Sequence, residues 1–286
     1  MVLWDEAVSN EPRRKRVSER YVHGYHDRER ARLRDQAGAL VELLHADTAY
    51  PAGSSVLEAG CGVGAQTVTL AQRSPGARFT AVDVSQLALA EAKQRVEGAG
   101  VTNVRFQQAD ILALPFSPES FDHVFVCFVL EHLKRPGDAL VTLRALLRPG
   151  GTITVIEGDH GSAYFHPRSE AAQRVIQCQV ELQEAAGGNA LIGRQLHPLL
   201  TAAGFDQVRV SPRMVYADGS KPDLADGFTR KTFTAMIEGV RDAAIAAGMT
   251  DAGTFAAGIR DLYRTAEAGG VFCYTFFKAV GEKPPV

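Results

Sequence analysis

The stretch that decides the fold reads Val56-Leu57-Glu58-Ala59-Gly60-Cys61-Gly62-Val63-Gly64. A short apolar run ends here in a turn with glycine at every second position, and a helix-compatible segment follows. Glycines in such a turn permit a tight change of direction and let a ligand approach main-chain N–H groups at the start of a helix. The motif therefore predicts a strand, a ligand-binding turn and a helix.

Strand-like and helix-like segments alternate along the rest of the chain. Strands are expected at Val56–Ala59, Arg78–Asp83, Val104–Gln108, Phe121–Cys127, Thr152–Ile156, Gln207–Pro212 and Val271–Ala279. Helices are expected at Gln66–Gln72, Leu87–Gly98, Ala139–Leu147, 167–186 and Ile192–Ala203, and over most of 17–46 and 216–268. Alternation of this kind implies an α/β fold with a parallel sheet covered on both faces.

The bulk composition excludes several classes of protein. The 286 residues are 45% hydrophobic and 22% charged, as in ordinary globular proteins. A net charge of -2 argues against a nucleic-acid-binding surface, and no apolar run approaches the ~20 residues of a membrane span. The four cysteines are widely spaced, so neither a disulfide framework nor a metal site is suggested. We expect a cytoplasmic protein without nucleic-acid or membrane partners.

Acidic residues stand at the ends of the first three expected strands. Glu58 lies just ahead of the turn, where a carboxylate would repel a pyrophosphate but would attract an ammonium group. Asp83 is in the position that hydrogen-bonds ribose hydroxyls, and Asp110 is placed to accept a hydrogen bond from an adenine amino group. A nicotinamide-dependent dehydrogenase is opposed by Glu58 and by the third glycine, which comes one residue earlier than in GxGxxG.

Together these motifs resemble the class I S-adenosylmethionine-dependent methyltransferases. The resemblance runs from Val56 to Ile156 and includes Leu114-Pro115-Phe116, Ser120-Phe121-Asp122 and Leu147-Arg148-Pro149-Gly150-Gly151. It implies a Rossmann-like, seven-stranded, mostly parallel sheet with an antiparallel last strand, and S-adenosylmethionine as the cofactor. The residues that we expect around the cofactor are Glu58, Gly60, Cys61, Gly62, Gly64, Gln66, Asp83, Asp110, Ile111, Cys127, Phe128 and His132.

The remaining segments are expected to cover the cofactor site. Residues 1–52 are interpreted as an N-terminal helical cap and residues 53–286 as the methyltransferase domain. Helical insertions at about 158–191 and 216–268 would form a lid on the same sheet, not a separate domain.

Two clusters are candidates for the acceptor side. Glu157–Gly161 is expected in a loop after the fifth strand, at the edge of the sheet where ligands bind. Asp159 would orient the His160 imidazole there as a catalytic base, although a histidine satisfied by local hydrogen bonds explains the pattern equally well. Tyr21 and Tyr25, one helical turn apart, either contact the acceptor or anchor the core. A base is needed only if the acceptor loses a proton.

The runs Tyr21–Tyr25, Glu157–Gly161 and Leu191–Gln195 are also similar to a narrower bacterial group. This group comprises the indole C3-methyltransferases of physostigmine-type alkaloid and tryptophan cyclodipeptide pathways. The similarity implies a small-molecule acceptor, an indole, whose C3 is methylated to give a pyrroloindoline. Candidates for its apolar pocket, or simply for the hydrophobic face of the inserted helices, are Phe165, Phe228, Phe233 and Met236.

Two alternatives remain open on the sequence. One is an O- or N-methyltransferase of another small metabolite, which would share every cofactor residue. The other is a cofactor-binding protein without catalysis. The oligomeric state is open as well.

Overall fold

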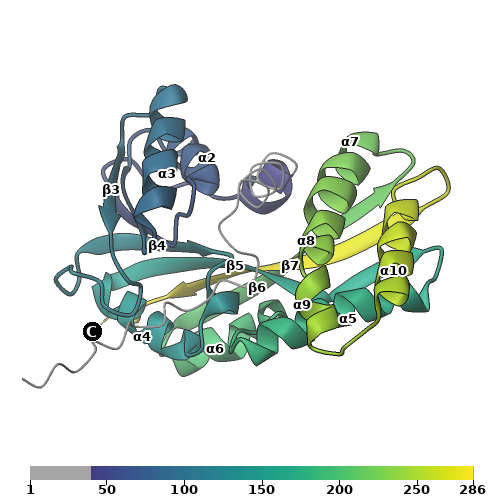
Figure 1. The fold of residues 1–286 in the computed structure, drawn as a ribbon. Coiled ribbons are helices and arrows are strands. Elements are labelled where there is room, and N and C mark those ends of the chain that lie inside the picture. Colours follow the sequence, from purple (N-terminus) through teal and green to yellow (C-terminus); the bar gives the residue numbers. More distant parts are fainter. Residues whose placement is uncertain (1–39, 286) are drawn as a thin grey trace, which may run out of the picture.

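The computed structural model describes residues 40–285, which form one mixed β-sheet with helices packed on it (Figure 1). Residues 40–45 are helical. The elements of the first half are β1 (Ser55–Ala59), α2 (Ala65–Arg73), β2 (Arg78–Asp83), α3 (Gln86–Gly98), β3 (Val104–Gln108), β4 (Phe121–Cys127), the 3-10 helix η1 (Leu130–His132), α4 (Pro136–Leu146) and β5 (Leu147–His166).

The second half adds helices and two more strands. Its elements are α5 (Glu170–Ala185), the 3-10 helix η2 (Ile192–Gln195), α6 (Leu196–Ala202), β6 (Asp206–Asp218), α7 (Pro222–Leu224), the π-helix η3 (Ala225–Thr234), α8 (Ala235–Gly239), α9 (Arg241–Ala246), α10 (Ala252–Arg264) and β7 (Val271–Glu282). The helices expected within 167–186 and 216–268 are therefore confirmed.

The strand order is β3-β2-β1-β4-β5-β7-β6. The first five strands run parallel to one another, whereas β7 is inserted antiparallel between β5 and β6. The predicted Rossmann-like, seven-stranded, mostly parallel sheet with an antiparallel last strand is confirmed. Because the order reverses between β1 and β4, the crevice at the carboxyl ends of these strands is the expected ligand site.

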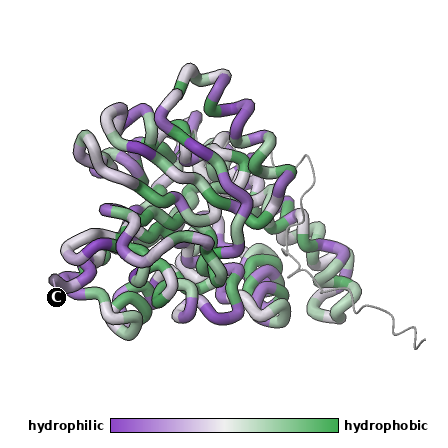
Figure 2. The backbone as a smooth tube through the Cα atoms, turned by 90° about the vertical axis from the view of Figure 1, so that its left-hand side faces the viewer, coloured by the Kyte–Doolittle hydropathy of each residue, from purple (hydrophilic) through white to green (hydrophobic). Residues whose placement is uncertain are grey.

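Side chains of the central strands alternate between two cores. Val56 packs into a core with α2 residues, whereas Leu57 packs into a core with α4 and α6 residues. In Figure 1, α2 and α3 accordingly lie on one side of the sheet and α4 and α6 on the other. Figure 2 shows hydrophobic residues concentrated in the interior and hydrophilic residues on outward-facing turns. Since a slip of one residue would exchange the two faces, this alternation fixes the strand register.

β5 is much longer than the sequence predicts. A strand over 152–156 is expected, but β5 continues to His166 and contains the Glu157–Gly161 stretch that was expected to be a loop. β7 pairs with β5 on both sides of a bulge, with Asp159 opposite Thr275 and Tyr164 opposite Cys273. The bulge accommodates the extra residues of β5, so the strand continues through a segment that reads as a loop.

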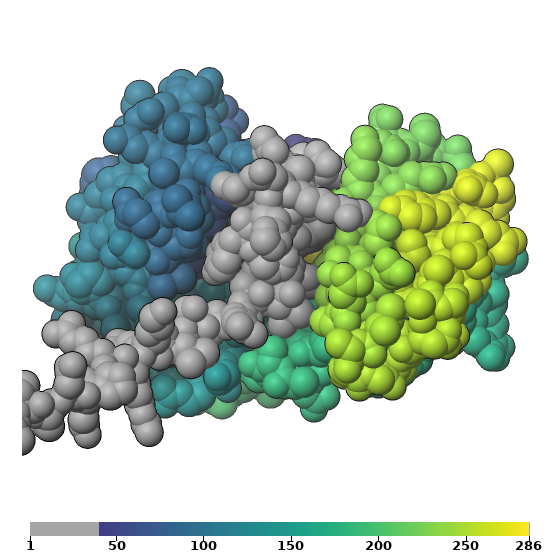
Figure 3. Space-filling view, in the orientation of Figure 1, coloured from purple at the N-terminus to yellow at the C-terminus, as the bar shows by residue number. Residues whose placement is uncertain are grey.

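The extended ends of β5, β6 and β7 carry the inserted helices. Figure 1 shows α5 and α7–α10 gathered at this end, whereas α2, α3 and the parallel strands lie at the other. In the space-filling view the same two regions occupy opposite ends of the face shown (Figure 3). Among residues 40–285, no helix combines the length and apolar character needed to cross a bilayer.

Candidate functional site

The glycine turn links β1 to α2 with a left-handed backbone. Gly60, Gly62 and Gly64 have φ of +79°, +52° and +75°, values that residues with a Cβ rarely adopt. A Cβ on Gly60 would collide with the Val129 side chain, and one on Gly64 would lie 2.9 Å from the Cα of Ala92. A Cβ on Gly62 would meet nothing within 4 Å. The turn is thus packed at its two ends and open at Gly62.

Glu58 is a buried carboxylate beneath this turn, 2% exposed. Its Oε2 atom has no hydrogen-bond partner among the described residues. Burial, with a smaller contribution from the charge of Asp83, raises the pKa of Glu58 to about 8. A buried acid of this kind needs a donor or a cation to compensate its desolvation, and the ammonium group of a methionine moiety has that chemistry.

Asp83 accepts a hydrogen bond on each carboxylate oxygen, one of them from the glycine turn. Oδ2 accepts the Gly62 N–H at 2.9 Å and Oδ1 accepts the Ser85 N–H at 2.8 Å. Because each carboxylate oxygen accepts more than one hydrogen bond, Asp83 retains capacity for ribose hydroxyls. Asp110 is exposed after β3 and accepts the Leu112 N–H at 2.9 Å, while the neighbouring Ile111 is half-buried.

Cys127 ends β4 and Phe128 begins the turn that follows. Phe128 has a φ of +57°, an uncommon value for a residue with a side chain and one often found at functional sites. Its ring centroid lies 5.3 Å from that of Phe276 on β7. Burial raises the pKa of the Cys127 thiol, and the nearby carboxylates of Glu157, Glu58 and Glu131 raise it further. This turn therefore lies close to three acids.

Gln66 lies on the first turn of α2 and contacts His45. The Gln66 Oε1 to His45 Nε2 distance is 2.6 Å, and burial lowers the pKa of His45 to about 4. Cys61, in the glycine turn, is buried with Ala81 and Leu89. Gln66 is thus next to the turn but is already hydrogen-bonded to the segment that precedes β1.

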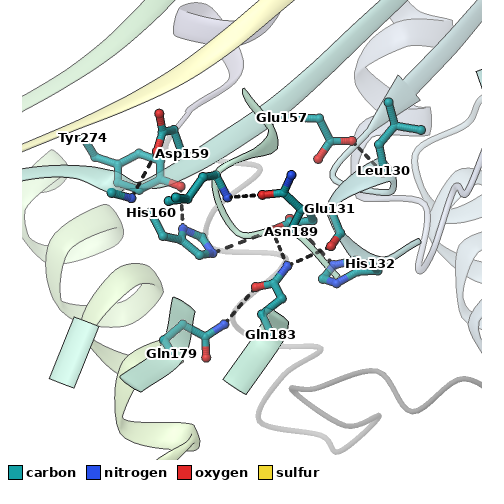
Figure 4. Close-up of polar contacts among 12 residues, drawn as sticks. Leu130, Glu131, His132, Glu157, Asp159, His160, Gln179, Gln183, Asn189 and Tyr274 are labelled. Atoms are coloured by element: carbon teal, nitrogen blue, oxygen red, sulfur yellow. Dashed lines mark hydrogen bonds and ion pairs between the residues drawn. The ribbon is translucent and has the colours of Figure 1, made fainter. Parts of the chain in front are cut away.

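A second, polar part of the site lies beyond β4 (Figure 4). His160 is in the β5 bulge and is buried, and its Nδ1 atom lies 2.7 Å from the hydroxyl of Tyr274 on β7. These two residues are 114 positions apart in the sequence. A Cβ at Gly158 would collide with the Tyr274 hydroxyl, so glycine at this position leaves room for the contact.

Glu131 is the centre of the polar cluster. Its Oε2 atom lies 3.7 Å from His160 Nε2 and 3.1 Å from Gln183 Nε2. Its Oε1 atom lies 3.7 Å from Nε2 of His132, and its main-chain carbonyl accepts the Asn189 N–H at 2.7 Å. His132 is therefore directed into this cluster.

Glu157 holds the turn after β4 through hydrogen bonds to its main chain. Its Oε1 atom accepts the N–H groups of Val129 at 3.0 Å and Leu130 at 2.7 Å. Burial, and then the charge of Glu131, raise the pKa of Glu157 well above its ordinary value. A carboxylate on main-chain N–H groups is a strong hydrogen-bond acceptor, so Glu157 fixes where η1 begins.

Asp159 does not orient His160, contrary to expectation. Its carboxylate forms a two-point contact with Arg194, with distances of 2.6 Å to Nε and 2.7 Å to Nη2. His160 lies instead beside Tyr274 and Glu131.

Aromatic side chains of the inserted helices pack against those of β7. Phe228 and Phe233 are 1% and 2% exposed, and the Phe233 ring lies 4.8 Å from that of Phe272 and 5.4 Å from that of Tyr274. Phe165 stacks on Phe272 at 6.5 Å, and Met236 belongs to the same core. Phe228, Phe233 and Met236 form the hydrophobic face of the inserted helices, as the simpler interpretation of the sequence predicts, whereas Phe165 lies on β5 and not on a helix.

Three expectations have different outcomes in this region. Tyr21 and Tyr25 lie outside the described residues. Tyr274 and Glu131 are not among the site residues that the sequence predicts. Their signals were the one tyrosine within the aromatic-rich run 272–277 and an acid beside His132. Among residues 40–285, no group of three or more His, Cys, Asp and Glu side chains has an arrangement that could hold a metal ion.

Comparison with known proteins identifies the region around the glycine turn. Residues 56–151 match the family described as Methyltransferase domain. The match covers about a third of the chain. Solved structures of a phosphoethanolamine N-methyltransferase of Haemonchus contortus, one of them in complex with S-adenosyl-L-methionine, share the fold at 18% identity.

Two relatives and one solved structure illustrate the range of similar proteins. An uncharacterized 37.1 kDa protein in a transposon of Streptomyces fradiae is 34% identical over 200 residues, which cover 69% of this chain and 56% of that protein. The ubiquinone/menaquinone biosynthesis C-methyltransferase of Paracoccus denitrificans is 35% identical over 106 residues, covering 37% of this chain and 42% of the relative. The chain thus spans about half the length of these curated relatives.

The cyclase SpnF has the same fold, with a TM-score of 0.52 and 20% identity over 88% of this chain and 82% of that structure. At this identity the likeness concerns the fold alone. Because the fold also occurs in a cyclase, the reaction must be argued from the site.

Proposed function

We propose that this protein transfers a methyl group from S-adenosylmethionine to a small-molecule acceptor. The observation that carries the proposal is the buried Glu58 carboxylate, whose Oε2 atom has no hydrogen-bond partner among the described residues, next to a turn that is open at Gly62. That combination suits a ligand that brings an ammonium group to the carboxyl end of β1. The methyltransferase-domain match over residues 56–151 supports the same reading.

We assign the cofactor residues by the chemistry of each position. Glu58 would hold the amino group, and Gly60, Cys61, Gly62 and Gly64 would surround the methionine part of the cofactor. Asp83 would accept the ribose hydroxyls, and Asp110 with Ile111 would contact the adenine. Cys127 and Phe128 would line the sulfonium end, with Gln66 and His132 at its margins. When bound, the cofactor supplies an electrophilic methyl group on sulfur.

The acceptor that we propose is an indole, methylated at C3. The ring nitrogen would supply the electrons, and a base would take its proton as the new carbon–carbon bond forms. C3 then becomes quaternary, and a side-chain nitrogen would close the pyrroloindoline. His160, buried between Tyr274 and Glu131, supports a role in proton transfer. The buried aromatic rings of β7 and η3 give this histidine an apolar surrounding, with the Phe233 ring 6.4 Å from that of His160.

The chain's own contribution would be alignment and exclusion of water. Methyl transfer is an in-line displacement, and correct alignment lowers its barrier without covalent participation of the protein. We propose that the insertions at about 158–191 and 216–268, together with a cap of residues 1–52, close over the acceptor. Asp159 would hold these insertions in place through its contact with Arg194. Tyr21 and Tyr25, within residues 1–52, would contact the acceptor.

The test is incubation of the full chain with methyl-labelled S-adenosylmethionine and a panel of indoles, phenols, amines and carboxylates. We expect a mass gain of one methyl group on an indole, with loss of the indole absorbance. Methylation of a hydroxyl or amine would retain the methyltransferase and overturn the indole acceptor. Failure to bind S-adenosylmethionine in equilibrium dialysis would overturn the main proposal.

A further inference from the structure

We propose that Tyr274, His160 and Glu131 form a proton relay whose first member, the Tyr274 hydroxyl, takes a proton from the methyl acceptor. The inference rests on the proposed methyltransferase function and narrows the acceptor class. It requires an acceptor that loses a proton from nitrogen or oxygen as the methyl group arrives. It also changes the role of His160, which becomes the second member of the relay and not the group that touches the acceptor.

The contacts give the relay its order. The Tyr274 hydroxyl lies 2.7 Å from Nδ1 of His160, which is a good hydrogen bond. On the far side of the ring, Nε2 lies 3.7 Å from Oε2 of Glu131. Gln183 donates to the same Oε2 at 3.1 Å and holds the carboxylate in place. The second step is longer than a hydrogen bond, so a small side-chain shift must shorten it before a proton can move.

The Tyr274 side chain is 1% exposed and lies just past the parallel part of the sheet. β7 runs antiparallel to β5 and brings the Tyr274 hydroxyl over Gly158. Phe276, two residues along on the same face, has its ring 4.8 Å from that of Tyr274 and 5.3 Å from that of Phe128. One ring therefore separates the Tyr274 ring from the turn assigned to the sulfonium end, and an acceptor must displace the side chains that cover the hydroxyl to reach it.

The chemical step balances without a further reactant. The acceptor's nucleophilic atom forms its bond to the methyl carbon as the carbon–sulfur bond breaks and sulfur keeps the electron pair. The acceptor proton moves to the Tyr274 oxygen, the hydroxyl proton to Nδ1 of His160, and the Nε2 proton to Glu131. Burial raises the pKa of Tyr274 well above its ordinary value. Tyr274 is therefore a poor store of negative charge and needs His160 to accept its proton.

A first test determines the protonation of His160 in the absence of turnover. Nitrogen-15 NMR of histidine-labelled full-length protein at neutral pH should show His160 as the neutral tautomer with its proton on Nε2. Nδ1 is then free to accept from Tyr274. In Y274F the Nδ1 resonance should shift, whereas Y216F, at a half-exposed position on β6, should leave it unchanged. A His160 proton on Nδ1 in the wild type would overturn the relay.

A second test compares two acceptors that differ in one proton. With tryptamine, Y274F should lower kcat by ~10²–10⁴-fold, with the KM for S-adenosylmethionine unchanged. With 1-methyltryptamine, which has no ring N–H to lose, wild type and Y274F should differ by less than about threefold. E131Q should reproduce this split between the acceptors, because it removes the terminal proton acceptor. A structural defect would instead slow both acceptors equally.

The outcomes separate this inference from the function on which it rests. Methyl transfer to tryptamine at an equal rate in wild type and Y274F would overturn the relay and leave the methyltransferase intact. Wild-type transfer to a phenol but not to an indole would overturn the indole acceptor. The relay would then be tested by comparing kcat of wild type and Y274F with that phenol, and equal rates would overturn it. No transfer to any acceptor would overturn the proposed function, while the NMR comparison would still decide the His160–Tyr274 contact.

Discussion

At the scale of single residues, the site depends on buried acids whose neighbours determine their protonation. Glu58 and Glu157 are both fully buried, yet they are held differently. Glu157 accepts the Val129 and Leu130 N–H groups through Oε1 and so fixes a turn. The Oε2 atoms of both acids have no hydrogen-bond partner among the described residues. Glu58, which lies next to the glycine turn, is the one that we expect to respond to cofactor binding.

Glu58 gives a prediction about pH. Its folded-state pKa of about 8 lies above the ordinary value, so its contribution to stability is complete below pH ~4.5 and is lost as pH rises through 8. The protein without cofactor should thus become less stable over this interval, and E58Q should show a smaller loss. An ammonium ligand favours the ionised acid, so binding near pH 7 should release about one proton.

Calorimetry in buffers of different ionisation enthalpy measures this proton. We expect E58Q to bind S-adenosylmethionine at least tenfold more weakly and to release no proton at pH 7. E97Q, on the exposed end of α3, is the matched control and should behave as wild type. Wild-type affinity in E58Q would refute the assignment of Glu58.

Alanine substitutions at two glycines of one turn should differ in their effects on stability and on cofactor affinity. Both have positive φ, so alanine at either position should cost ~1–2 kcal/mol of stability. Gly64 also packs against the Ala92 backbone, so G64A should lose a further ~1–3 kcal/mol. G62A places a methyl group in open space beside the proposed cofactor, and its main effect should be on affinity. Urea unfolding together with cofactor titration separates the two effects, and equal stability losses with equal affinities would contradict this expectation.

At the scale of elements, β5 is the strand that differs most from the one predicted from the sequence. The parallel strands and their helices could be predicted, because apolar runs, a glycine turn and terminal acids are local signals. The extension of β5 could not, since Gly158, Asp159, His160 and Gly161 resemble a loop. Their polar groups are satisfied by partners distant in sequence, such as Arg194 and Tyr274. Local patterns contain no information about such partners.

The candidate site divides in the same way. The positions of its cofactor half could be predicted, because the turn and the acids follow strand ends, and the roles assigned to these residues stay predictions. Its acceptor half was predicted as His160 with Asp159, and as Tyr21 and Tyr25, which lie outside the described residues. The partner chosen for that histidine was its sequence neighbour Asp159, whereas the structure pairs it with Tyr274. Alternation along β7 puts Phe272, Tyr274 and Phe276 on one face, but only the sheet order brings that face to β5.

The Asp159–Arg194 pair gives a prediction for the attachment of η2 to β5. Asp159 is almost fully buried and Arg194 is half-exposed, with two short contacts between them. R194M would leave the carboxylate buried without its cation, and we expect a loss of ~1–3 kcal/mol in the free energy of unfolding. R135M, which removes an exposed pair with Asp138 on α4, should change it by less than ~1 kcal/mol. Equal effects of the two substitutions in urea unfolding would refute the role of the pair.

At the scale of the whole molecule, β7 connects parts that are far apart in the sequence. Its residue Lys278 is buried, and its Nζ atom lies 2.6 Å from both Asp47 Oδ1 and Thr48 Oγ1. The same amino group donates to the Leu44 carbonyl at 3.3 Å. One strand therefore holds the segment before β1, the aromatic core and the polar cluster around His160.

Removing this amino group should release the segment before β1. K278M should lower stability by ~1–3 kcal/mol, the usual range for hydrogen bonds to a charged group. Hydrogen exchange should accelerate at residues 40–48 more than in β1 or β2. K93M, at an exposed pair on α3, should leave both measurements unchanged. Uniform acceleration over all strands would show that Lys278 supports the fold generally and not this segment.

The place of β7 in the sheet also bears on how the protein is made. β7 follows all other described strands in sequence, yet it lies between β5 and β6. On the ribosome, β5 and β6 therefore emerge without the strand that joins them, and β6 has no other strand to pair with. The relay is incomplete until Tyr274 arrives, whereas the glycine turn and its parallel strands are already synthesised. A nascent chain would thus acquire a cofactor site before an acceptor site, and a chain interrupted before residue 271 would have no means of assembling the second.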